Sequence, residues 1–138
     1  MRNKVIEEAK TWLMTPYHHQ GRVKGVGIDC LTLLAEVYER AGVIDHVEPG
    51  NYSQQWMLHR SEEKYIKGLM IYCDEIERPG RADIAVWKIG RTYSHGAIVV
   101  DWPLIIHAYL PEGFVVYGDA SRGELSTRPV RFFSPRSF

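Results

Sequence analysis

The sequence predicts an α+β domain in which N-terminal helices pack on an antiparallel sheet of about five strands. Apolar residues recur with helical spacing only in roughly the first half of the chain. From Pro79 onward the chain consists of short runs rich in β-branched and aromatic residues. We find no internal repeat, low-complexity stretch or linker in the 138 residues, so we expect one domain spanning 1–138.

Three helices are expected before the strands begin. The first spans about 3–14 and ends before Thr15-Pro16, because the residue before a proline disfavours helical backbone. The second spans about 29–41, with Asp29 as a suitable N-cap and Gly42 as a stop. The third opens with Ser61-Glu62-Glu63 and carries apolar residues at helical spacing, namely Tyr65, Ile66, Leu69 and Met70.

Five strands are expected in the second half of the chain. The runs are DIAVWKI, GAIVVDW, LIIHAYL, FVVYGD and PVRFF. Segments rich in glycine, proline and serine separate them, and most of these segments are short. Because strands joined by short turns usually pair with their neighbours in sequence, the spacing predicts an antiparallel meander.

Composition argues against several classes of function. The chain is 45% hydrophobic and 25% charged, with 17 basic and 17 acidic residues and no long basic run. A general attraction to nucleic acid is therefore not expected. Glu7 and Glu8 interrupt the N-terminal apolar residues, which excludes a signal peptide or membrane span there. We expect a protein made in the cytoplasm without a signal peptide, with no nucleic-acid partner and no membrane insertion.

Cys30 is the first candidate for chemistry. It begins a predicted helix directly after a glycine-rich loop. The free N–H groups and partial positive charge of a helix N-terminus favour a thiolate and can bind an oxyanion, so we expect a lowered Cys30 pKa. The alternative is a small buried residue on the inner face of the helix. Cys73 is interpreted as a packing residue, and without an export signal no disulfide is expected.

Two histidines lie on predicted neighbouring strands. His95 opens one strand beside small residues, and His107 lies inside the apolar run LIIHAYL. Neighbouring antiparallel strands can place the two rings side by side, so that one faces the cysteine and the other fixes its tautomer. Taken singly, each histidine is better explained as a hydrogen-bonded structural residue.

Tyr17 and Asp29 are candidate oxyanion or substrate contacts. Tyr17, in the loop before Cys30, could reach the oxyanion or the thiol, or could pack as a loop aromatic. Asp29 could contact a substrate amine, although capping its own helix is the simpler role.

The adjacent histidines His18 and His19 raise the alternative of a zinc site. Such a site would combine one of them with Cys30, His95 and His107. Adjacent residues of an extended chain point to opposite sides, so at most one of the two could take part. Because the chain has no HExxH or CxxC motif, we prefer solvent exposure for this pair and expect no metal and no cofactor.

Three motifs together resemble the signature of the NlpC/P60 family of cysteine peptidases. They are Thr15-Pro16-Tyr17 with Asp29-Cys30, Ser94-His95-Gly96-Ala97-Ile98, and Ile106-His107-Ala108. The version PYHHQG…KGVGIDC is similar to the subgroup encoded in phage tail modules and gene transfer agents.

The resemblance implies a papain-like fold and a function. It implies hydrolysis of peptide bonds in peptidoglycan stem peptides, typically between D-glutamate and a diamino acid. Cys30 would be the nucleophile, His95 the general base and His107 the orienting residue, with Tyr17 near the oxyanion. Many members have Ser-Gly after the Asp-Cys pair, where this chain has Leu31-Thr32, so the substrate contacts there differ.

The sequence thus predicts a cysteine endopeptidase that acts as a phage tail or prophage component. Peptidoglycan peptides and phage tail proteins are its expected partners, and a tail or related particle is its expected location. Two alternatives remain open at this point. One is a catalytically silent structural or assembly component of a tail. The other is a thiol amidase or acyltransferase on the same fold.

Overall fold

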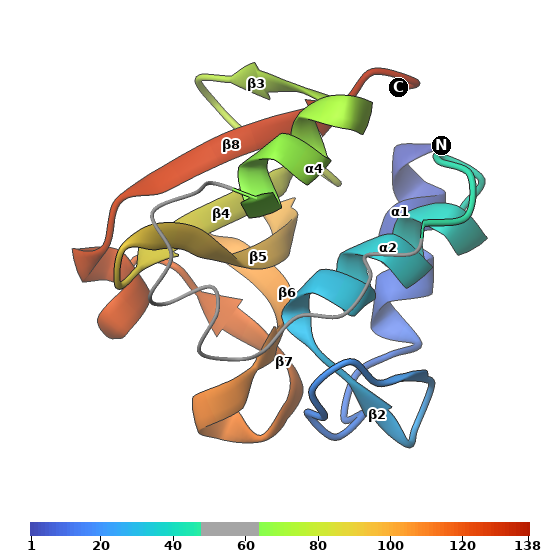
Figure 1. Cartoon of the computed structure of the whole chain (residues 1–138), viewed down its shortest axis with the longest axis horizontal. Coiled ribbons are helices and arrows are strands. Elements are labelled where there is room, and N and C mark those ends of the chain that lie inside the picture. The colour runs from blue at the N-terminus through green and yellow to red at the C-terminus, as the bar shows by residue number, and fades with distance from the viewer. Residues whose placement is uncertain (48–63) are drawn as a thin grey trace.

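Helices cover one face of a six-stranded antiparallel sheet (Figure 1). The computed structural model describes residues 1–47 and 64–138. Among them the helices are α1 (Arg2–Lys10), α2 (Cys30–Arg40) and α4 (Lys64–Tyr72). The sheet consists of β3 (Cys73–Ile76), β4 (Ile84–Ile89), β5 (Thr92–Asp101), β6 (Leu104–Tyr109), β7 (Phe114–Asp119) and β8 (Val130–Pro135). The short strands β1 (Arg22–Val23) and β2 (Gly27–Ile28) pair with each other, and η1 (Leu110–Glu112) and η2 (Glu124–Thr127) are 3₁₀ turns. The predicted α+β class is confirmed.

The strand order differs from a simple meander. Strands β4 to β7 do pair in sequence, but the full order is β3-β8-β4-β5-β6-β7. The last strand, β8, returns across the sheet and lies between β3 and β4. The prediction of about five strands therefore missed β3, which is only four residues long and carries two exposed acidic residues. Such a short polar strand has no clear alternation of its own.

Helix α1 ends earlier than the sequence predicts. That helix ends at Lys10, and the chain then turns through Met14, which has a positive φ of 69°. Helix α2 begins and ends close to the predicted bounds, and Asp29 forms a capping box with Thr32. The predicted opening of the third helix at Ser61 to Glu63 lies outside the described residues. Among the residues that are described, no helix has the length and apolar character needed to span a bilayer.

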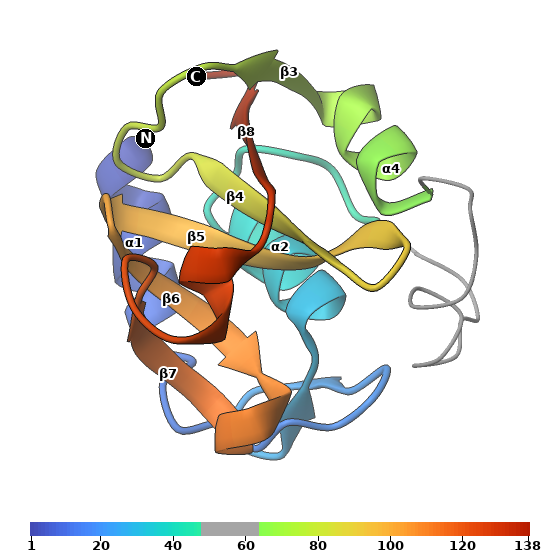
Figure 2. The ribbon, with the colours of Figure 1, turned by 90° about the vertical axis from the view of Figure 1, so that its left-hand side faces the viewer.

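Two apolar clusters lie on the two faces of the sheet. The larger one joins α1 and α2 to the sheet through buried residues such as Leu33, Val37 and Ile98. The smaller one, which includes Trp87, lies on the other face, where the segment containing η2 crosses the strands (Figure 2). Sequence-adjacent residues of β5 therefore face different clusters.

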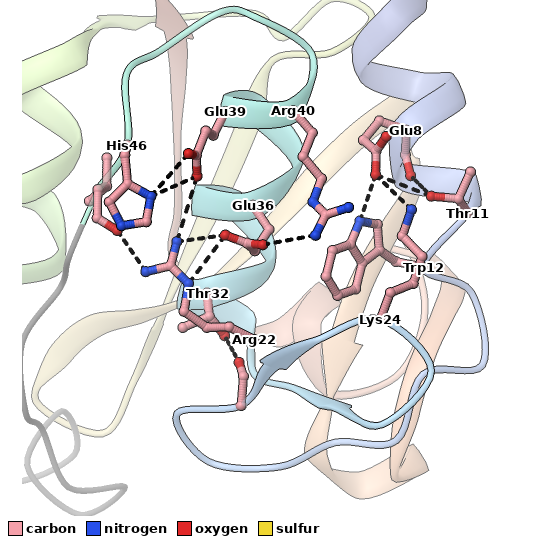
Figure 3. A network of polar contacts seen from close by, with 12 residues as sticks. Glu8, Thr11, Trp12, Arg22, Lys24, Thr32, Glu36, Glu39, Arg40 and His46 are labelled. Carbon is pink, nitrogen blue, oxygen red and sulfur yellow. Dashed lines mark hydrogen bonds and ion pairs between the residues drawn. The ribbon is translucent and has the colours of Figure 1, made fainter.

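An ionic network ties the β1–β2 hairpin to α2 (Figure 3). Arg22 on β1 bonds Glu36 of α2 through two nitrogens, at 2.7 and 3.2 Å, and donates to the Val47 carbonyl at 2.6 Å. Next to it, Lys24 binds Glu8 of α1 at 3.0 Å. Because these pairs connect the loop to both helices, they fix the loop that leads into Cys30.

Candidate active site

Cys30 is the first residue of α2 and is only 3% exposed. Its thiol donates to the Ser94 carbonyl oxygen at 3.5 Å. The backbone N–H of Gly96 also acts on this thiol, because a hydrogen bond from it lowers the Cys30 pKa. The predicted nucleophile thus lies against the two residues that flank His95. The sequence separation between Cys30 and Ser94 is 64 residues, so this meeting is a product of the fold.

Burial, with a smaller contribution from the nearby Asp29 charge, raises the pKa of the Cys30 thiol to about 12. Hydrogen bonds from the Gly96 N–H and the Tyr65 hydroxyl act in the opposite direction. The lowered pKa expected from the helix N-terminus is therefore wrong for this conformation, because the thiolate would lose its hydration. The group is a neutral thiol near pH 7.

His95 and His107 form the predicted pair. The Nε2 atom of His95 and the Nδ1 atom of His107 are 2.8 Å apart. One ring nitrogen must donate and the other accept. If His95 Nε2 carries the proton, its Nδ1 is left as a base, and His107 stabilises the imidazolium that forms. This arrangement matches the roles of a base and its orienting residue.

Burial lowers the pKa of His95 to about 4. It also lowers the pKa of His107 to about 3, with a smaller contribution from the charge of His95. Both rings are therefore neutral near pH 7, which is the protonation state that a general base requires.

The thiol and the histidine pair meet at β5 from different sides. Gly96 faces Leu34 of α2, whereas the His95 ring contacts the Trp87 ring, with centroids 5.8 Å apart. Among the described residues, the Cys30 thiol makes its hydrogen bond to Ser94 and none to the His95 ring. Proton transfer between them therefore requires the thiol or the ring to move. A register shift in the β4–β5 ladder beside Ser94 gives this stretch an irregular backbone, as is common near active sites.

Tyr17 lies close to the thiol. Its hydroxyl pKa is raised by burial and then by the Cys30 and Asp29 charges. Its backbone forms a bridge with Ile28 and bonds the Gly113 carbonyl, which fixes the loop beside the α2 N-terminus. The structure thus brings Tyr17, Asp29 and Cys30 together.

The Asp29 carboxylate is occupied by the protein itself. One oxygen accepts from the N–H groups of Leu31 and Thr32 and from the Thr32 hydroxyl, at 2.9 to 3.1 Å. The other accepts from the Gln20 N–H at 2.7 Å. The capping role is therefore observed, and a contact with a substrate amine stays a prediction.

The other loop histidines lie apart from the His95–His107 pair. His18 is exposed, and its Nδ1 atom is 3.0 Å from the His19 carbonyl oxygen. His19 Nδ1 lies 3.7 Å from Asp29. In residues 1–47 and 64–138, no group of three or more His, Cys, Asp or Glu side chains is arranged to hold a metal ion. The zinc alternative therefore finds no ligand set in this part of the chain.

Several residues of the site had no clear signal in the sequence. The Tyr109 ring stacks on His107, with centroids 4.6 Å apart and an interplanar angle of 16°. Gly118 lies so close that a Cβ there would be 2.7 Å from His107 Nε2. Tyr65 of α4 donates to the Cys30 carbonyl at 3.4 Å. All of these contacts depend on tertiary packing, although Gly96 directly after His95 is a local hint of a crowded position.

Solved structures share this fold. The NlpC/P60 domain of the peptidoglycan hydrolase SagA aligns with a TM-score of 0.62 at 18% identity, over 95% of this chain and 97% of that one. Two proteins of Trichomonas vaginalis also align over 97% of this chain. NlpC2 gives a TM-score of 0.71 at 18% identity over 46% of its chain. NlpC1 gives 0.70 at 17% identity over 43% of its chain.

Sequence comparisons alone do not reveal this relationship. No protein-family model matches the chain, and no curated protein matches it either. Identities of 17–18% to the solved structures establish shape and not activity. The helices and the antiparallel sheet therefore lead to one conclusion: the chain has the α+β fold of NlpC/P60 domains.

Proposed function

We propose that the chain is a cysteine endopeptidase that cleaves peptide bonds in bacterial peptidoglycan stem peptides. The observation that carries this proposal is the hydrogen bond between His95 and His107 on neighbouring strands. Cys30 lies against Ser94, the residue directly before His95. The fold shared with a peptidoglycan hydrolase domain supports the substrate class. The bond between D-glutamate and a diamino acid is the proposed cleavage site, on the strength of the motif resemblance.

The proposed mechanism is acyl transfer through Cys30. His95 takes the thiol proton while the sulfur attacks the peptide carbonyl, and His107 stabilises the His95 imidazolium. His95 then gives this proton to the leaving amine, and a thioester remains on Cys30. Water, deprotonated by His95, attacks the thioester and releases the carboxylic acid and the restored thiol.

The developing oxyanion needs donors near the α2 N-terminus. The N–H groups of Leu31 and Thr32 already bond Asp29. In the proposed mechanism the Cys30 N–H and the Tyr17 hydroxyl bind the oxyanion. Tyr17 keeps its proton at all relevant pH values because its pKa is raised, so it can act as a donor.

The proposed setting is a phage tail or related particle. The motif version PYHHQG…KGVGIDC, which is similar to tail-module peptidases, supports this setting. The near-zero formal charge also supports it, because a free hydrolase would need its own attraction to an anionic wall. In this proposal, tail proteins carry the chain to the wall.

A second candidate function is a silent structural component of a tail. The observation that favours it is the burial of Cys30, whose pKa is raised to about 12. A thiol with that pKa is almost entirely protonated near pH 7 and is a poor nucleophile.

Digestion of purified peptidoglycan separates the two candidates. Wild type, Cys30→Ala and the matched control Cys73→Ala are incubated with sacculi, and the released muropeptides are analysed by mass spectrometry. We expect cleavage by wild type and Cys73→Ala, with new ends at D-glutamate, and none by Cys30→Ala. Equal release by wild type and Cys30→Ala would contradict the peptidase proposal. If folded wild type released no muropeptides, even under conditions that expose the buried Cys30 thiol, the structural role would be favoured.

A further inference from the structure

Tyr65 covers Cys30 from α4. This tyrosine is 5% exposed, and its hydroxyl donates to the Cys30 carbonyl oxygen at 3.4 Å. A hydrogen bond from the same side chain acts to lower the pKa of the Cys30 thiol, against the larger effect of burial. The phenol therefore lies directly beside the group that the proposed mechanism requires to be open to substrate.

Gly96 provides the space for this phenol. A Cβ built on Gly96 would collide with the Tyr65 hydroxyl oxygen and would lie 3.0 Å from the adjoining ring carbon. It would also lie 2.9 Å from a methyl carbon of Leu34 on α2. The Tyr65 ring thus lies between the first turns of α2 and the β5 backbone, against the residue that directly follows His95.

The groups around the sulfur leave little space for a substrate. The Ser94 carbonyl oxygen lies 3.5 Å from it, and the Tyr65 hydroxyl bonds the carbonyl of the same cysteine at 3.4 Å. A peptide carbonyl has to come within about 3–3.5 Å of the sulfur for attack. The thiol is moreover bonded to Ser94 and not to the His95 ring, so both its partner and its surroundings are those of an inactive arrangement.

A neighbouring cavity offers the phenol another position. It has a volume of about 480 Å³ and lies between α2 and α4, and Tyr65 itself lines it. Most of its other walls are apolar, including Leu34, Leu69 and Tyr72. If the Tyr65 ring entered this cavity, its hydroxyl would need water or another hydrogen-bond partner there. The cavity wall contains polar groups that could serve, such as Lys64.

We propose that Tyr65 is an autoinhibitory side chain that holds Cys30 in a covered, latent state. Movement of the phenol away from Gly96 exposes the sulfur and frees the thiol to turn from Ser94 toward His95. The proposal rests on the proposed function only in taking Cys30 as the nucleophile. The covering itself is a matter of access and can be tested without any substrate.

Alkylation of Cys30 measures this access. The full chain is treated with iodoacetamide near pH 7.5, and labelling of Cys30 and Cys73 is followed separately by peptide mass analysis. Wild type is compared with Tyr65→Ala and with Tyr65→Leu, which keeps apolar packing on α4 but is too short to reach Gly96. The matched control is Tyr72→Ala, which removes the same side chain from the far end of α4, on the wall of the same cavity.

We expect iodoacetamide to label Cys30 about tenfold faster in both Tyr65 variants than in wild type. The reason is that the conformation with an exposed Cys30 is only a minor population in wild type. Cys73 labelling, and Cys30 labelling in Tyr72→Ala, should stay within about threefold of wild type. The proposal is overturned if both Tyr65 variants label at the wild-type rate, or if Tyr72→Ala is as fast as they are. The second result would mean that any loosening of α4 exposes the thiol.

Stem-peptide hydrolysis by the same variants keeps the two proposals distinguishable. Faster alkylation together with faster hydrolysis by Tyr65→Ala supports both. Faster alkylation without any hydrolysis supports the covering and contradicts the peptidase. Unchanged alkylation contradicts the covering whatever the hydrolysis assay gives.

Discussion

The Cys30 thiol is under two opposing influences, and their magnitudes decide its state. A helix N-terminus contributes about 0.3–1 kcal/mol toward a thiolate at an ordinary site. Raising the thiol pKa from 9.0 to about 12 corresponds to about 4 kcal/mol in the other direction. Burial therefore dominates, and the motif position of Cys30 does not by itself make it reactive. Reactivity requires the covering groups to move.

Gly118 controls the position of His107. Gly118→Ala places a methyl carbon 2.7 Å from His107 Nε2, which is too close, and should displace the ring from its 2.8 Å contact with His95. We expect kcat/KM for stem-peptide hydrolysis to fall about 10- to 100-fold, because a shift of about 1 Å in a catalytic group can have that effect. The matched control is Gly68→Ala, at a site with nothing within 4 Å of the added Cβ. Full activity in Gly118→Ala would show that the histidine contact is not needed.

Asp29 should matter first as a helix cap. Asp29→Ala removes the acceptor for the N–H groups of Leu31 and Thr32, and we expect the free energy of unfolding to fall by about 1–2 kcal/mol. Asp29→Ser, which keeps a capping oxygen, should recover much of that loss. Urea unfolding measures both. An Ala variant as stable as wild type would contradict the capping role, and a raised KM in a stable Ser variant would support the predicted substrate contact.

At the scale of the elements, helices and central strands follow from local patterns, whereas strand order does not. The runs that form β4 to β7 are long, apolar and separated by clear turns, so their pairing could be predicted. The place of β8 between β3 and β4 depends on contacts between segments that are far apart in the sequence, such as the Arg131–Glu75 bond pair, whose residues are 56 positions apart. No local pattern carries that information.

The site shows the same division between local and long-range information. Cys30, His95 and His107 could be selected because each has a short motif around it. The Tyr65 contact joins residues 35 positions apart, and nothing around Tyr65 marks it. Tyr65 differs from the other apolar residues of α4 in its contact with Cys30, which only the tertiary fold creates.

The Arg22–Glu36 pair should contribute to stability because it is largely shielded from water. Within residues 1–47 and 64–138, Arg22→Met leaves the buried Glu36 carboxylate with only the longer 3.4 Å contact to Arg40. We expect a loss of about 1–3 kcal/mol in the free energy of unfolding, measured by urea denaturation. The control Arg122→Met removes a surface pair with Asp119, in which the arginine side chain is 85% exposed, and should change stability by less than about 0.5 kcal/mol. Equal effects of the two substitutions would contradict this interpretation of the network.

At the scale of the whole molecule, the buried histidines make stability depend on pH. Their folded pKa values, about 4 for His95 and about 3 for His107, lie below the ordinary value of 6.5. Between these values the unfolded chain binds protons that the folded chain does not, so stability falls as pH decreases. The loss begins near pH 6.5 and is complete below the folded pKa values.

Urea unfolding between pH 4 and 8 tests this dependence. We expect wild type to lose stability steadily below about pH 6.5, and a His95→Gln, His107→Gln double variant to lose less over the same range. The difference between the two curves isolates the histidine contribution from that of the carboxylates. Parallel curves would mean that the two rings are protonated as easily in the folded protein as in the unfolded chain.

The central claim is that Cys30 and His95 act as one catalytic unit, and a double-variant comparison of hydrolysis rates tests it most directly. The kcat/KM for a purified stem peptide is measured for wild type, Cys30→Ala, His95→Ala and the double variant. Residues that act as a unit are strongly non-additive, so the double variant should be no slower than Cys30→Ala alone. Losses that simply multiply, or a Cys30→Ala variant that retains most of the activity, would contradict the account.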